Sequence, residues 1–173
     1  MLTKQDLATP TLIEGWLRDL ALVPTPRQDG QNAWNLEFVV TGSNNLVMNV
    51  VNPKSIPRAI MLVCGMSPVA AHVAAFQSRS EELRESFWKD LRRMLSREFV
   101  EFQFEGTPVL ECPKVLRISA VRFDDGLTLD SFSRTLASVC KACSDTIVFF
   151  SERLGDPNAP VGGEFAFRKS GTQ

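Results

Sequence analysis

The sequence predicts one α+β domain in which helices pack on an antiparallel sheet of five strands, in the order α-βββ-α-ββ-α. Three observations lead to this fold class. A helical apolar stripe runs from Thr128 to Leu154. Apolar and polar residues alternate in several short segments earlier in the chain, which is typical of half-buried strands. The connections between the first three of these segments are short, as antiparallel neighbours require.

Composition is typical of an ordinary globular protein. The chain has 173 residues, which suit one domain at residues 1–155 followed by a tail rich in proline and glycine at residues 156–173. A net charge of −1 gives no sign of nucleic-acid binding. The sequence lacks a signal peptide and an apolar run long enough for a membrane, so we expect a cytoplasmic protein whose four cysteines are reduced.

The segment from Thr128 to Leu154 is the longest predicted element. Thr128 is suited to capping its first turn, and Gly155 can end it with a positive φ. Because such a long apolar stripe must be buried, we expect the preceding strands to supply the surface that it covers. The stripe consists of Leu129, Phe132, Leu136, Val139, Cys140, Cys143, Ile147, Phe150 and Leu154.

The chain begins with a predicted helix from Thr9 or Thr11 to about Ala21. Residues 23–32 are predicted to form a loop, because they contain prolines and a glycine and show no periodicity. Three strands follow, over residues 34–41, 46–52 and 58–64. In the third of these strands both alternating sets of side chains are apolar, so we expect it to be covered on both faces.

A helical region then opens at Ser67-Pro68 and is renewed from Ser80 to about Arg97. Its apolar residues span roughly 140° of the helix surface, which is wider than a simple surface helix needs. They are Leu83, Phe87, Trp88, Leu91, Met94 and Leu95. Two further strands, from Val100 and over residues 115–123, complete the predicted sheet.

This succession of elements, with Ser67-Pro68 before the middle helix and the strand FVEFQFEG directly after it, resembles the type III secretion chaperone-like fold over residues 9–154. That fold is shared by the Tir chaperone family and by the YbjN-like family of proposed sensory-transduction regulators. The resemblance implies a strongly curved sheet, a homodimer built through the middle helix and nearby strands, binding of extended partner segments, and no catalytic site. Secretion chaperones are shorter and more acidic, so the YbjN-like domains are the nearer analogy.

We expect five apolar residues to contact a partner or a second copy of the chain: Phe87, Trp88, Leu95, Val148 and Phe149. The last two fall off the stripe of the long helix, so we expect them to be exposed. Alternatively, the tail covers them, since Phe165 and Phe167 suggest an added edge strand.

Residues suited to catalysis or metal binding are few. Cys140 and Cys143 form a CxxC motif in the middle of the long helix, where both lie on the apolar stripe, which favours buried packing over redox chemistry. A zinc site would need Cys64 and Cys112 to converge on this pair. His72 is the only histidine, which leaves a catalytic dyad or triad dependent on one residue. We therefore predict no enzyme, no cofactor and no metal.

The leading hypothesis is a non-enzymatic, chaperone-like module that binds a protein or peptide segment, with a homodimer as its expected assembly. The alternative is a regulatory domain of the YbjN-like type that senses a small molecule in a cavity between the long helix and the sheet. Neither hypothesis involves nucleic acid or a membrane.

Overall fold

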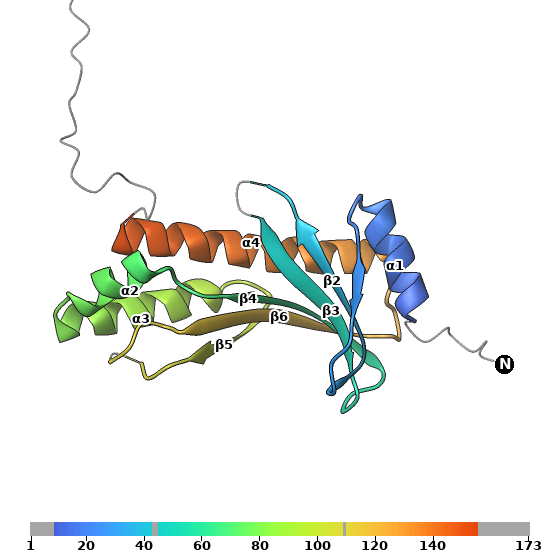
Figure 1. Ribbon diagram of the computed structural model, residues 1–173, viewed down its shortest axis with the longest axis horizontal. Helices are drawn as coiled ribbons and strands as arrows, with labels where there is room; N and C mark the ends of the chain where they lie inside the picture. Colours follow the sequence, from blue (N-terminus) through green and yellow to red (C-terminus); the bar gives the residue numbers. More distant parts are fainter. Residues whose placement is uncertain (1–8, 43–44, 109, 156–173) are drawn as a thin grey trace, which may run out of the picture.

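The computed structural model describes residues 9–42, 45–108 and 110–155 of the chain (Figure 1). It confirms the α+β class with an antiparallel sheet. The elements are α1 Pro10–Asp19, β1 Thr25–Arg27, β2 Asn32–Val40, β3 Leu46–Pro53, β4 Ala59–Met66, α2 Ala70–Gln77, α3 Glu81–Leu95, β5 Glu101–Glu105, β6 Val115–Phe123 and α4 Leu129–Leu154.

The sheet has six strands in the order β1-β2-β3-β4-β6-β5, and every neighbouring pair is antiparallel. The expected number of five was wrong because β1 lies in the segment that we predicted to be a loop. This strand has only three residues, and Pro26 is among them. A proline is tolerated on an edge strand, where its missing N–H faces no partner, but it removes the alternation that identifies a strand in a sequence.

Long helix α4 runs along one face of the sheet, which we name the inner face (Figure 1). Its apolar stripe packs there against side chains that alternate along the strands, so the predicted burial is confirmed for most of the stripe. Fully or almost fully buried members of this core are Phe38, Met48, Val50, Leu62 and Ile118 from the strands, and Phe132, Val139, Ala142 and Cys143 from α4.

Helix α3 completes the core at one end of α4. The ring of Phe87 lies 5.4 Å from Phe76, 5.1 Å from Phe149 and 5.3 Å from Phe150, measured between centroids. The Trp88 ring packs edge-on against Phe104 of β5, and its indole N–H donates to the backbone oxygen of Glu111 at 3.2 Å. Most of the wide apolar arc of α3 is therefore buried by contacts within one chain, whereas Leu83 at its start is 54% exposed.

Helices α1, α3 and α4 begin at polar side chains that satisfy free backbone N–H groups, whereas α2 begins after Val69 without a side-chain cap. Thr9 caps α1, Ser80 caps α3, and Thr128 forms a capping box with Ser131 at the start of α4. At the other end of α4, Gly155 has a positive φ of 97°, as a helix-ending glycine allows. These ends fix the long helix against the sheet.

We expect replacement of Phe87 by alanine to lower the free energy of unfolding by about 3–5 kcal/mol, because it leaves a cavity among three other aromatic rings. The matched control is Val23→Ala, since that side chain is 80% exposed and its removal is expected to change stability by less than about 0.5 kcal/mol. Urea unfolding followed by circular dichroism measures both. Similar losses of unfolding free energy in the two variants would contradict the placement of Phe87 in the core.

Candidate functional site

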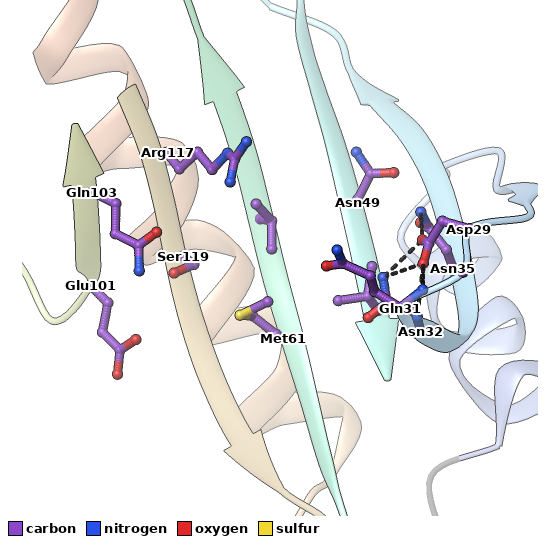
Figure 2. Close-up of a pocket in the computed structure, with 13 residues that line it drawn as sticks. Asp29, Gln31, Asn32, Asn35, Asn49, Met61, Glu101, Gln103, Arg117 and Ser119 are labelled. Carbon is purple, nitrogen blue, oxygen red and sulfur yellow. Dashed lines mark hydrogen bonds between the residues drawn. The ribbon is translucent and has the colours of Figure 1, made fainter. Parts of the chain in front are cut away.

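The face of the sheet opposite α4, which we name the outer face, carries an open groove of about 650 Å³. Its central lining, from β2, β3, β4 and β6, is formed by Asn35, Asn49, Val51, Met61, Val63 and Ser119, and we name this hollow the outer groove (Figure 2). Residues of the β1–β2 loop line one side, and Glu101 and Gln103 of β5 line the other. Because strands from both ends of the sheet contribute, the sheet curves around this face.

The floor of the outer groove is apolar. Val51 of β3 pairs with Met61 of β4, and in the neighbouring row apolar Val63 lies between the polar residues Asn49 and Ser119. Val51 is only 5% exposed, whereas Met61 and Val63 are half-buried. These side chains point away from α4, so they belong to a second apolar surface outside the main core.

The walls of the outer groove are rich in side-chain amides, which come from Gln31, Asn32, Asn35, Asn49 and Gln103. Each amide offers both a donor and an acceptor, as a peptide bond does. The far wall also holds Arg117, whose guanidinium forms a 3.0 Å ion pair with Glu105. The lining therefore combines amides and the charged groups of Asp29, Glu101 and Arg117 with an apolar floor, which suits a ligand that has both polar and apolar surface.

A hydrogen-bonded loop builds the near wall. The carboxylate of Asp29 accepts from the backbone N–H of Gln31 and of Asn32, and from the side-chain amides of Asn32 and Asn35, at 2.8–3.0 Å. These bonds, led by that of the Asn32 side chain, lower the pKa of Asp29 from 3.8 to about 2. The Asn35 amide is thereby oriented with its NH₂ toward Asp29, and its buried oxygen has no partner in the described part of the chain.

The expectation that β4 is covered on both faces was wrong for the described residues. No helix among them packs on the outer face, and Met61 and Val63 are shielded only by the curvature of the sheet and by neighbouring side chains. Apolar side chains on both faces of β4 therefore indicate a hollow on the outer face and not a second layer of helices. That pattern is the one sequence signal that could have located the outer groove.

Four of the five residues that we expected at a partner contact lie inside the single chain. Phe87, Trp88 and Leu95 are buried in the core. Phe149, which we expected to be exposed, is 8% exposed, because α3 packs on the side of α4 that the predicted stripe left free. Val148 is 50% exposed and lies at the surface as expected. Contact with a partner stays a prediction.

The cysteines come together only in part. Cys64 of β4 lies beside Cys143 of α4, and Cys140 Sγ lies 3.5 Å from Met48 Sδ. Cys112 lies in the β5–β6 loop, and within residues 9–42, 45–108 and 110–155 no set of three metal-ligating side chains converges. Burial raises the pKa of the Cys140 thiol to about 11, which disfavours the reactive thiolate.

His72 is buried, and its Nε2 lies 3.0 Å from the backbone oxygen of Gly155. The guanidinium of Arg79 donates to the backbone oxygen of Arg153 beside it. Both side chains of the α2 region therefore satisfy carbonyl groups at the end of α4. This position gives His72 a structural contact in the core.

In the described parts of the chain, no helix is both long and apolar enough to span a bilayer.

We expect Asp29→Ala to lower the melting temperature at pH 7, because four N–H and amide donor groups lose the carboxylate that accepts their hydrogen bonds. The lowered pKa of Asp29, about 2 against an ordinary 3.8, means that its charged form stabilises the fold above pH 4 and that this stabilisation is lost as pH falls toward 2. The gap between parent and variant should therefore narrow between pH 4 and pH 2. Thermal unfolding at several pH values measures this difference in melting temperature, with Asp19→Ala as an exposed control. If the difference in melting temperature stayed constant from pH 4 to pH 2, the charged form of Asp29 would not be what stabilises the loop.

Comparisons with known proteins agree with this fold. A solved structure of an uncharacterized protein from Methanothermobacter thermautotrophicus is similar with a TM-score of 0.75 and 23% identity, over 84% of this chain and 98% of that one. YbjN from E. coli, a proposed transcription regulator, is similar with a TM-score of 0.50 and 11% identity, over 84% of this chain and 93% of YbjN. No curated protein matches. The family model for the uncharacterized conserved protein DUF2299 matches residues 10–150, so the chain belongs to the DUF2299 family.

Proposed function

We propose that this protein is a non-enzymatic interaction module that holds an extended segment of another protein in the outer groove. The observation that carries the proposal is the outer groove itself, an open hollow with an apolar floor and amide walls on the face of the sheet that the helices leave uncovered.

The chemistry of the lining supports a polypeptide as the ligand. Asn49 and Gln103 stand on opposite sides of the apolar floor (Figure 2), and each can donate to a peptide C=O and accept from a peptide N–H. Successive side chains of an extended segment point to opposite sides. Alternate residues can therefore enter the floor at Met61 and Val63 while the backbone meets the amides.

A homodimer in the cytoplasm remains our expected setting for this module. The contact that we first expected on α3 is occupied within the chain, since Phe87 and Trp88 pack against α4 and β5. A symmetric contact would therefore use other surfaces, of which exposed Val148 on α4 is one.

A second candidate function is a regulatory domain that senses a small molecule, and the size of the outer groove favours it. Its volume of about 650 Å³ lies within the range of about 300–1,000 Å³ that small-molecule sites occupy. The fold of YbjN, itself a proposed transcription regulator, is consistent with this candidate. The originally expected location between α4 and the sheet is filled by buried side chains such as Val139 and Leu62.

Selection of peptides from a random displayed library, followed by calorimetry, tests the peptide proposal. We expect Val63→Lys to weaken the selected peptides by at least about tenfold, because it places a charge in the apolar floor. The matched control is Val47→Lys, since Val47 lies on the outer face, is 49% exposed and lies outside the outer groove. Equal affinities for the two variants would reject the outer groove as the peptide site.

A thermal-shift screen with small metabolites tests the second candidate in the same variants. If the groove senses a small molecule, a stabilising compound should raise the melting temperature of the parent and of Val47→Lys but not of Val63→Lys. Stabilisation that survives in Val63→Lys would show that the compound binds elsewhere. If every stabilising compound raised the melting temperature of Val63→Lys as much as that of the parent, the groove would not be the sensing site.

A further inference from the structure

One strand of the sheet extends beyond its neighbour and leaves a short open edge. Strand β6 pairs with β4 as far as Phe123, which lies opposite Ala59. Its pairing with β5 ends at Ser119, which lies opposite Glu101. On that side, residues 120–123 have no strand partner in the described chain. We name this site, with the adjoining residues 98–101, the edge notch.

The backbone groups at the edge notch can be identified from the register. The N–H of Asp124 donates to the backbone oxygen of Arg58 at 3.0 Å. Backbone groups alternate in direction along an antiparallel ladder. The backbone N–H and C=O of Arg122 therefore also point toward β4, whereas those of Val121 and Phe123 point to the open side. There the guanidinium of Arg122 donates to the oxygen of Val121 at 3.0 Å. A side chain thus occupies one position that a further strand would fill.

The edge notch is hollow and flanked by exposed aromatic rings. A cavity of about 380 Å³ is lined by residues 98–101 and 120–122. Phe99 is 89% exposed beside it, and Phe123 is 56% exposed at the end of β6. Natural sheets block free edges with proline, charge or a covering segment. Edge strand β1 contains Pro26, whereas the edge notch presents apolar Val121 between two exposed rings.

We propose that the chain's own residues 165–169, Phe-Ala-Phe-Arg-Lys, add to the edge notch as a short β-strand. The two phenylalanines are two residues apart, so an extended segment directs both to one side, as pairing beside Val121 and Phe123 requires. The basic pair Arg168-Lys169 follows them. Acidic residues stand at both ends of the edge notch, Glu101 at the start of β5 and Asp125 after β6, so the basic pair meets an acidic residue in either strand direction.

The length of the tail allows this contact within one chain. The notch lies beside the middle of α4, because Glu98 forms a 2.7 Å ion pair with Lys141. Lys141 precedes Leu154 by 13 residues (154 − 141), which is about 20 Å of helix. Phe165 lies ten positions after Gly155 (165 − 155), and an extended chain over ten positions spans up to about 33 Å. Tethering also gives the segment a high effective concentration.

Amide hydrogen exchange on the full chain tests the proposal at two named sites. We expect the N–H groups of Val121 and Phe123 to exchange at least about tenfold faster in a double variant with Phe165→Ser and Phe167→Ser than in the parent. The matched control is Val161→Ser, which changes an apolar residue of the tail outside the docking segment and should leave both rates unchanged. Equal rates in the parent and the double variant would overturn the proposal.

Two further measurements test the charge pairing and distinguish the chain's own tail from a second copy as the segment that fills the edge notch. Reversal of the basic pair, with Arg168→Glu and Lys169→Glu, should also accelerate exchange at Val121, because it brings like charges to Glu101 and Asp125. Protection in the parent should be independent of protein concentration, because docking of a tethered segment is an intramolecular step. Protection that rises with concentration, together with a doubled native mass, would overturn docking within one chain in favour of a second copy.

Discussion

The packing of α4 against one face of the sheet is the contact on which the rest of the structure depends. Its apolar residues meet strands β4 and β6 at the middle of the sheet, where the core side chains are almost fully buried. Burial of a continuous apolar surface is the main favourable term in folding. Helices α1, α2 and α3 add to this layer, since Trp16 of α1 packs on Phe132 of α4, and Phe76 of α2 packs on Phe87 of α3, which also contacts α4. In the described residues the sheet therefore has one face buried under helices and one face that carries an open hollow.

This asymmetry explains why the outer groove lies where it does. A sheet that keeps its helices on one side must satisfy its other face with polar side chains or leave apolar ones for a partner. Here the outer face carries both kinds of side chain, because Asn49 and Ser119 alternate with Val51 and Met61 across the central strands. The Asp29 loop closes one end of the hollow and orients Asn35. The edge notch lies at a different place, where β6 extends beyond β5.

The sequence was sufficient for the fold class because each main element has a strong local pattern. The stripe of α4 and the alternation in the strands follow from burial on one side, and Thr128 and Gly155 mark the ends of α4 as expected. Strand β1 was missed because three residues with a proline carry no alternation. Phe149 was placed outside because the helical stripe assumes one packed side, whereas α3 contacts a second side of α4. The outer groove depends on residues of β2 and β5 that are far apart in sequence, and only curvature of the sheet brings them to one hollow.

The most direct test of this account compares the two faces of the sheet in solution. A soluble paramagnetic agent, added to protein with labelled methyl groups, broadens the signals of methyl groups that solvent can reach. We predict strong broadening at Met61 and Val63 of the outer groove and little at Leu62 and Val50 of the inner face. Equal protection at all four residues would contradict the open outer groove, because it would mean that another segment or a second copy covers that face.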